Sequence, residues 1–223
     1  MQYKYELHCH TEGVSKCAEV APEAVVCELV KAGYNGVVIT DHLNRSTVCD
    51  MQDAEWDEVI SHFLSGYKRA LLSAPEGFTV LLGMELTLDH SYNDYLIYGV
   101  TEKFLRAQPR NLMELDLREL SQIISDNGML LVQAHPFRDY MTVSDPNLLD
   151  GIEVYNGNSR ARSRNDIATI WAKKFGLMET SGSDYHLPED VNRGGISTDT
   201  VVNNNNDLLQ LLKVGDYSII KTD

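Results

Sequence analysis

Two histidines, His8 and His10, stand one residue apart directly after a short run of aromatic and apolar residues. Residues 3–7 have the composition of a β-strand, and a strand points residues i and i+2 to the same face. The two imidazoles should therefore project together, and a pair of imidazoles on one face is able to bind one metal ion. Since a single His-x-His pair occurs readily by chance, the other histidines decide how this pair is interpreted.

Further residues of the metal-binding types follow other short and largely apolar runs. Each such run resembles a buried strand, so each of these side chains would stand at or just after the end of a strand. Carboxylates among them would add hard oxygen ligands to the imidazoles. These residues are His42, Glu85, His135, Asp184 and His186.

The composition fits one globular domain spanning residues 1–223. The chain is 43% hydrophobic, 8% aromatic and 23% charged, which is typical of a protein that buries a large core. No apolar run approaches the roughly 20 residues of a membrane span, and the N-terminus lacks a basic segment followed by an apolar signal core. We therefore expect a cytoplasmic protein with no membrane partner.

The formal net charge of −14 disfavours a long nucleic acid as partner, because binding to a phosphate backbone normally requires a basic surface. Three bound divalent ions would reduce this charge to roughly −8, so a small anionic ligand remains possible. The four cysteines are Cys9, Cys17, Cys27 and Cys49. Their spacing favours neither a disulfide framework nor a cysteine-rich zinc site.

Strand-like runs alternate with helical patterns along the chain. Helices are expected at about 22–32, 54–72, 113–125, 163–175 and 207–212, and a hairpin or bent pair of strands around 78–100. Such alternation predicts an α/β fold with a parallel sheet. Ligand-type residues at the ends of many different strands favour a closed barrel over an open sheet, because the carboxyl ends of barrel strands converge on one mouth.

Five ordered motifs resemble those of the PHP family, the polymerase and histidinol phosphatase domains. They are His-Cys-His-Thr at 8–11, Ile-Thr-Asp-His at 39–42, Gly-Met-Glu at 83–85, Ala-His-Pro at 134–136 and Ser-Gly-Ser-Asp-Tyr-His at 181–186. Residues 153–157 and 193–195 resemble the small stand-alone members rather than those attached to polymerases. The resemblance covers nearly the whole chain and implies a distorted (β/α)7 barrel and metal-dependent phosphoesterase activity.

The resemblance also implies a set of metal ligands. One ion would be bound by His8, His10, Glu85 and Asp184, and a second would share Glu85 and add His135. Asp94 holds the place where the family often has a further histidine, and a third ion would use His42 and His186. The cofactors would be two or three divalent ions of manganese, iron or zinc.

The third site departs from the family pattern. The family usually has an Asp or His five to seven residues after the position of His10, but this chain has Ser15, Lys16 and Cys17 there. Cys17, Glu12 or Glu19 could substitute, whereas the ammonium of Lys16 would oppose a cation. Two metals and three metals both remain open.

Hydrolysis at such a centre uses a water that loses a proton when bound to metal, and the resulting hydroxide attacks phosphorus. Asp41 and His186 are the candidate catalytic acid groups. For Asp41, a hydrogen bond that orients the neighbouring imidazole is an equal alternative. Three arginines follow predicted site strands and could bind phosphate through charge-assisted contacts, although they could equally be solvated surface residues. They are Arg138, Arg160 and Arg193.

The sequence therefore predicts metal-dependent hydrolysis of a phosphate ester, with a small phosphorylated metabolite or nucleotide as substrate. The alternative enzyme class is amidohydrolase-type hydrolysis of a carbon–nitrogen bond, but the active-site lysine of that class has no counterpart between the histidine motifs. A non-catalytic metal-binding module is the third interpretation. The sequence leaves open the choice of monoester or diester and the oligomeric state.

Overall fold

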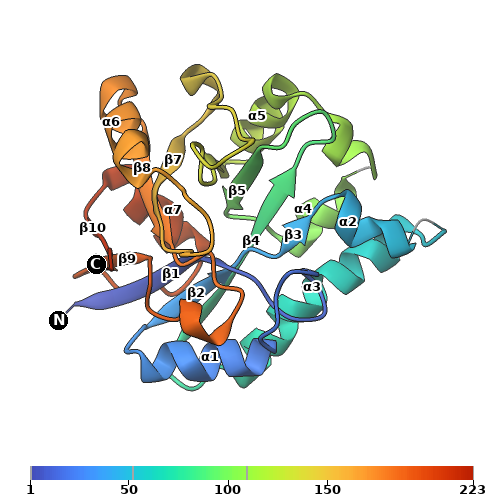
Figure 1. Cartoon of the computed structure of the whole chain (residues 1–223). Helices are drawn as coiled ribbons and strands as arrows, with labels where there is room; N and C mark the ends of the chain where they lie inside the picture. The colour runs from blue at the N-terminus through green and yellow to red at the C-terminus, as the bar shows by residue number, and fades with distance from the viewer. Residues whose placement is uncertain (1, 52, 109, 223) are drawn as a thin grey trace.

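The computed structural model describes residues 2–51, 53–108 and 110–222, and its centre is a curved sheet surrounded by helices (Figure 1). The strands run in the order β10-β9-β1-β2-β4-β5-β6-β7-β8, with β3 paired to β4. Their bounds are β1 (Tyr3–Cys9), β2 (Gly36–Ile39), β3 (His42–Leu43), β4 (Thr79–Thr87), β5 (Asp94–Tyr98), β6 (Leu130–Gln133), β7 (Gly151–Asn156), β8 (Met178–Gly182), β9 (Ile196–Thr198) and β10 (Ser218–Ile219).

The sheet nearly closes on itself between β8 and β1. The amide of Tyr185 donates to the carbonyl of His8 at 3.1 Å, and the amide of His10 donates to the carbonyl of Tyr185 at 3.0 Å. A side chain at Gly182 would come within 2.2 Å of the His8 Cβ, so glycine is required where β8 approaches β1. The prediction of a distorted α/β barrel, with main strands β1, β2 and β4 to β8, is confirmed.

One main strand runs against the others. β5 is antiparallel to both β4 and β6, whereas the pairs β1–β2, β2–β4, β6–β7 and β7–β8 are parallel. The expected bent pair around 78–100 is therefore confirmed, and β5 is the exception among the otherwise parallel main strands. Because β5 is reversed, its first residue, Asp94, pairs with Thr87 at the carboxyl end of β4.

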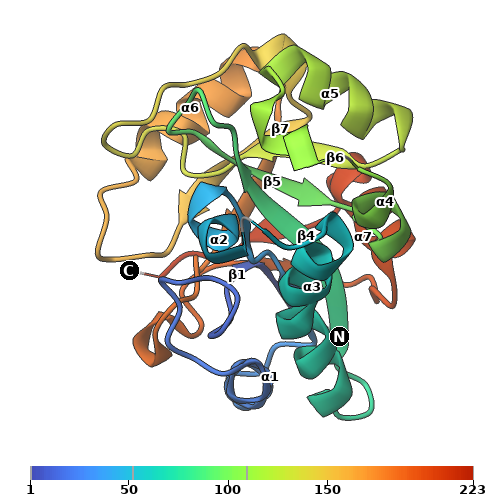
Figure 2. The same cartoon turned by 90° about the vertical axis from the view of Figure 1, so that its right-hand side faces the viewer.

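Helices lie on the outer side of the barrel, with α1 and α3 next to each other (Figure 2). Arg69 on α3 forms an ion pair with Glu23 on α1. Apolar side chains of α3, α4, α5 and α6 pack against the sheet in the largest buried cluster. The helix bounds are α1 (Pro22–Lys31), α2 (Arg45–Val48), α3 (Trp56–Ser73), α4 (Glu102–Ala107), α5 (Leu117–Asp126), α6 (Asn165–Phe175) and α7 (Asn205–Val214).

Four of the expected helices are present with ends shifted by a few residues, and one is divided. Residues 113–125 contain the end of a 3₁₀ helix, Arg110–Glu114, followed by α5. The division arises because the Asp116 side chain accepts a hydrogen bond from the Glu119 amide and starts a new helix there. The short helices α2 and α4 were not predicted, since four and six residues carry little periodic pattern. Within the described ranges, no helix is long and apolar enough to cross a membrane.

Candidate metal centre

Glu85, near the end of β4, is surrounded by four imidazoles. Its Oε2 lies 3.3 Å from His8 Nε2, 3.2 Å from His10 Nε2 and 3.0 Å from His42 Nδ1, and its Oε1 lies 3.2 Å from His135 Nε2. Burial alone would raise the pKa of Glu85, but the neighbouring histidines outweigh it and hold that pKa well below its usual value. The Glu85 carboxylate is therefore available as a shared anionic ligand.

Asp184 approaches the same imidazoles from the other side. Its Oδ1 lies 3.5 Å from His8 Nε2, 3.4 Å from His10 Nε2 and 3.2 Å from His186 Nδ1. Asp184 and His135 both have a positive φ, at 52° and 29°, a conformation that is costly for residues with a side chain. Such strain is typical of residues whose position is determined by a functional site.

Asp94 joins the cluster from the start of the reversed strand β5. Its Oδ2 lies 4.0 Å from His135 Nε2, and Thr87 Oγ1 donates to its Oδ1 at 2.5 Å. Burial, followed by the neighbouring charge of Glu85, raises the pKa of Asp94 to about 6. Donor atoms of Glu85, Asp94 and His135 lie within 4.8 Å of one another, a spacing compatible with a common cation.

Several of these donor atoms are buried and have no hydrogen-bond partner among the described residues. They are His8 Nε2, His10 Nε2, His42 Nδ1 and Glu85 Oε2. A buried polar atom without a partner normally costs about 1–3 kcal/mol, so native structures rarely keep several together. Imidazole nitrogens and carboxylate oxygens aimed at one space are the ligand set of a divalent transition metal, and the residues present fit such ions.

Glu153, on β7, orients two of the imidazole-bearing residues. Its Oε1 lies 2.9 Å from His8 Nδ1, and its Oε2 accepts from the His135 amide at 3.0 Å. This contact favours the tautomer of His8 that carries its proton on Nδ1, which leaves Nε2 free to bind metal. The sequence analysis did not assign Glu153 a role, although a carboxylate within an apolar strand is a signal that could have identified it.

Asp41 faces the loop after β1 rather than the mouth of the barrel. It accepts hydrogen bonds from the Thr11 amide at 2.7 Å, from Thr11 Oγ1 at 2.6 Å and from Ser15 Oγ at 2.7 Å. Ser15 Oγ in turn accepts from the His42 amide at 3.0 Å. These contacts favour the alternative role of Asp41, a residue that positions neighbouring ligands, and its catalytic role stays a prediction.

Replacing Asp41 with alanine should destabilise the metal-free protein, because three buried donors lose their acceptor. We expect a loss of about 1.5–3 kcal/mol in the free energy of unfolding, measured by urea denaturation. Asp126→Ala is the control, since Asp126 is exposed and accepts a hydrogen bond from exposed Gln122. Equal unfolding midpoints for the two variants would contradict the assigned role of Asp41.

A cavity of about 390 Å³ opens above the cluster. Burial lowers the pKa of His42 to about 3, so this imidazole is neutral and suited to bind a metal. The cavity is where a substrate would meet the metal ligands. Its lining includes His42, Glu85, Asp94, His135, Asp184 and His186.

Two of the three predicted arginines line this cavity. Arg138 Nη2 donates to Asp184 Oδ2 at 2.7 Å and to Asn156 Oδ1 at 3.0 Å, while its buried Nε has no hydrogen-bond partner among the described residues. Arg160 donates through both Nη atoms to the carboxylate of Asp190, at 2.6 and 2.7 Å. Arg138 is therefore the better candidate to contact a phosphate, because Asp190 takes both Nη atoms of Arg160, whereas Asp184 takes one Nη atom of Arg138.

Arg193 does not line this cavity, so the structure does not support its predicted phosphate contact. Its amide donates to Ser183 Oγ at 3.1 Å, and its Nε donates to the carbonyl of Glu189 at 2.7 Å. The guanidinium therefore turns back along its own loop. Arg193 follows a predicted site strand in the sequence, but this position alone does not decide whether its side chain points into the cavity.

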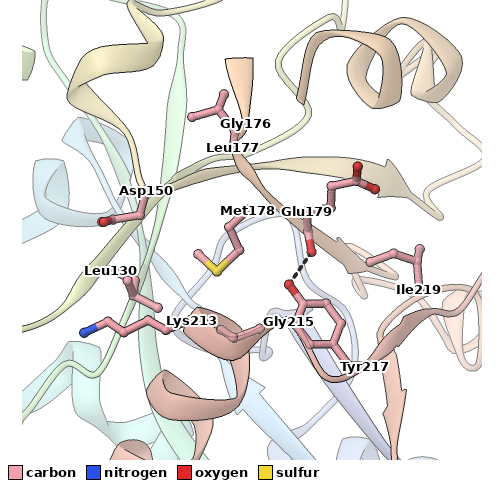
Figure 3. A pocket seen from close by; sticks show the side chains of 11 residues that line it. Leu130, Asp150, Gly176, Leu177, Met178, Glu179, Lys213, Gly215, Tyr217 and Ile219 are labelled. Carbon is pink, nitrogen blue, oxygen red and sulfur yellow. Dashed lines mark hydrogen bonds between the residues drawn. The ribbon is translucent and has the colours of Figure 1, made fainter. Parts of the chain in front are cut away.

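A larger cavity, of about 560 Å³, lies near the opposite end of the barrel (Figure 3). Residues at or next to the starts of β6, β7 and β8 line it, together with Lys213 and Tyr217. Tyr217 donates a hydrogen bond from its hydroxyl to the carbonyl of Glu179 at 2.8 Å. None of the residues that line this cavity is a histidine, so size alone does not identify the reactive site.

The fold and the cluster together define a distorted α/β barrel with a candidate metal centre at the carboxyl ends of its strands. Residues 162–217 match the family model described as PHP-associated. This match covers about a quarter of the chain and agrees with the resemblance to the PHP family that the ordered motifs indicate. No curated protein sequence matches the chain.

Solved structures share the fold at low sequence identity. A two-domain protein from Bacteroides vulgatus that contains a predicted PHP-like metal-dependent phosphoesterase has a TM-score of 0.70 and 16% identity, over 99% of this chain and 65% of that one. Endonuclease Q, in complex with a 27-mer duplex substrate, has a TM-score of 0.69 and 16% identity, over 98% and 58%. An amidohydrolase from Chromobacterium violaceum has a TM-score of 0.53 and 15% identity, over 97% of each chain. The chain thus spans less than two thirds of the first and second of these proteins.

Proposed function

We propose that the protein hydrolyses a phosphate ester of a small metabolite or nucleotide at this cluster, with divalent metal ions as cofactors. The observation that carries the proposal is the set of buried imidazole and carboxylate donors without partners at the barrel mouth. The similar structures include two described as metal-dependent phosphoesterases, one of them PHP-like, and an endonuclease, which supports phosphoester hydrolysis as the reaction class. We further propose that residues 1–223 act as one domain; a cytoplasmic location stays a prediction.

In the proposed centre, His8, His10, Glu85 and Asp184 hold one ion, and Glu85, Asp94 and His135 hold another. When bound, such ions supply Lewis acidity and lower the pKa of a bound water toward neutrality. The protein contributes the orientation of these ligands, in which Glu153 fixes the ring of His8. His186 lines the cavity and stays a candidate either as a ligand or as a group that transfers a proton.

Arg138 gives the proposed site its preference for an anionic substrate. Its guanidinium lies beside Asp184 at the edge of the cavity, and its Nε bonds to no other residue in the described parts of the chain. Arginine presents parallel donors that match the oxygens of a phosphate. A fixed cation next to the metal ligands would position the phosphoryl group over them.

The second candidate is hydrolysis of a carbon–nitrogen bond, which the structural similarity to an amidohydrolase favours. No lysine is among the residues that line the mouth cavity in the described parts of the chain, which favours phosphate ester hydrolysis. Endonuclease Q acts on DNA, so the similarity to it weakens the expectation that nucleic acid is not a substrate. The net charge of −14 and the small cavity still favour a small substrate.

The proposal is tested by a substrate screen with protein reconstituted separately with Mn²⁺, Fe²⁺ and Zn²⁺. The panel contains phosphomonoesters, phosphodiesters, a short DNA duplex with an abasic site, and cyclic amides. We expect turnover of a phosphate ester that disappears with a chelator and returns when metal is added. Turnover of an amide alone would support the second candidate, and metal binding without turnover of any compound would favour a non-catalytic module.

A further inference from the structure

The loop after β1 places the thiol of Cys17 at the edge of the candidate metal centre. The Ala18 amide donates to the carbonyl of Ser15 at 3.0 Å, and the Glu19 amide donates to the carbonyl of His186 at 2.9 Å. The backbone on the C-terminal side of Cys17 is therefore attached to the segment that carries His186. Cys17 Sγ lies 3.1 Å from His186 Nε2 and lines the mouth cavity.

The contacts of His186 leave Nε2, the ring nitrogen that can bind a metal, facing Cys17. Its Nδ1 lies 2.8 Å from the carbonyl of Asp184, an oxygen that only accepts hydrogen bonds. Nδ1 must therefore carry the proton in a neutral ring that makes this contact, so Nε2 keeps its lone pair. An imidazole that donates through one nitrogen to a carbonyl and offers the other is a typical metal ligand.

A second observation points to a cation at the same place. His10 Nε2 and His42 Nδ1 are buried and have no hydrogen-bond partner among the described residues. Donor atoms of His10, His42 and His186 lie within 4.8 Å of one another. The rings of His42 and His186 both pack against the His10 ring, with centroids 4.3 and 4.2 Å from it and 6.1 Å from each other. The nearest carboxylates, Glu85 at 3.0 Å from His42 Nδ1 and Asp184 at 3.2 Å from His186 Nδ1, are proposed ligands of another ion, so a further anionic ligand would complete this set.

The two residues before Cys17 do not supply that anion. Ser15 Oγ is committed to Asp41 and to the His42 amide. Lys16 Nζ is turned toward Asp50 and lies 3.2 Å from Cys49 Sγ, so its positive charge does not face the cluster. The electrostatic objection that the sequence raised against a third ion is thereby removed. Cys17 and Glu19 both line the mouth cavity, and the contact of the Cys17 thiol with His186 Nε2 favours Cys17 as the missing ligand.

We propose that Cys17 binds a metal ion as a thiolate, together with His42 and His186, and replaces the oxygen or nitrogen ligand expected from the family pattern. The inference rests on the proposed metal centre and adds a thiolate–imidazole site to it. A sulfur ligand favours softer ions, so this site should prefer Zn²⁺, Fe²⁺ or Co²⁺ over Mn²⁺. The other two ion positions, built from carboxylates and imidazoles, should not share that preference.

Cobalt titration of the full chain tests the proposal without any substrate. Binding of Co²⁺ to a thiolate produces a sulfur-to-metal charge-transfer band in the near ultraviolet, which nitrogen and oxygen ligands do not give. We expect the parent protein to show this band. Cys17→Ser should lose the band. It should also weaken the binding of one Co²⁺ by about 10–100-fold, the loss that is typical when residues supporting a metal site are changed. Cys49→Ser is the matched control, since Cys49 is also an exposed thiol, and it should keep the band.

Differential alkylation gives a second measurement. Added Zn²⁺ should protect Cys17 from iodoacetamide, whereas exposed Cys27 should react at the same rate with and without metal. A band that persists in Cys17→Ser, or two Co²⁺ bound by the parent protein with no band, would overturn the thiolate ligand and leave the proposed phosphoesterase centre intact. A band with no phosphoesterase turnover would support the ligand and count against the proposed function.

Discussion

Glu85→Gln is expected to abolish the shared metal centre and with it almost all turnover. Glu85 lies within 3.3 Å of donor atoms from His8, His10, His42 and His135, so no other described carboxylate contacts so many of the proposed ligands. Glutamine keeps the shape of the side chain but removes the negative charge that the proposed ions would share. We expect loss of at least one bound ion per chain and a decrease of kcat/KM by at least about 10³-fold, measured by metal analysis and steady-state kinetics.

Glu76→Gln is the matched control for this variant. Glu76 is an exposed glutamate just before β4, so the same chemical change is made near the other end of the strand. It should bind metal and turn over substrate like the parent protein. If Glu85→Gln kept the metal content and the kcat/KM of the parent, the central role of this carboxylate would be disproved.

The second large effect is expected for Arg138→Ala. Loss of a charge-assisted contact to a phosphate costs about 1.5–3 kcal/mol, which corresponds to a decrease of roughly 10–150-fold in kcat/KM. Arg138 also donates to Asp184 Oδ2, so the metal content must be measured in the same variant. Unchanged metal content with reduced kcat/KM would indicate a contact to the substrate, whereas loss of an ion would indicate that Arg138 mainly positions Asp184.

Arg193→Ala provides the comparison, because the Arg193 guanidinium turns toward Glu189 and does not line the cavity. Its kcat/KM should equal that of the parent protein. A defect in Arg193→Ala as large as that in Arg138→Ala would restore the original expectation from the sequence. Parental kinetics in both variants would exclude an arginine contact to the phosphate at these two positions.

Much of the candidate site could be predicted from the sequence because the topology assembles it. His8, His10, Glu85 and His135 stand at strand ends, and neighbouring parallel strands bring their carboxyl ends to one edge. Asp94 was different: its place at the mouth depends on the reversal of β5, and only the family resemblance suggested it.

Other features depend on contacts that local patterns do not encode. Glu153 lies within β7, and its contact with His8 follows from the approach of β8 and β7 to β1. Hydrogen bonds from the distant Thr11 determine where the Asp41 side chain points, whereas the Arg193 side chain turns toward the carbonyl of Glu189 in its own loop. The same applies to Lys16, whose contact with Asp50 turns it away from the mouth.

The closure of the barrel between Tyr185 and β1 also determines when the metal centre can form during protein synthesis. A ribosome makes the segment with His8 and His10 first, but Asp184 and His186 emerge only after more than three quarters of the chain. Until then, the edge of β1 that later pairs with Tyr185 and β9 has no partner, and such an edge favours aggregation. Metal uptake that needs both groups of ligands must therefore follow translation of the last barrel strand. A bound ion would then indicate that the segment after β8 has paired with β1 and that the barrel is closed.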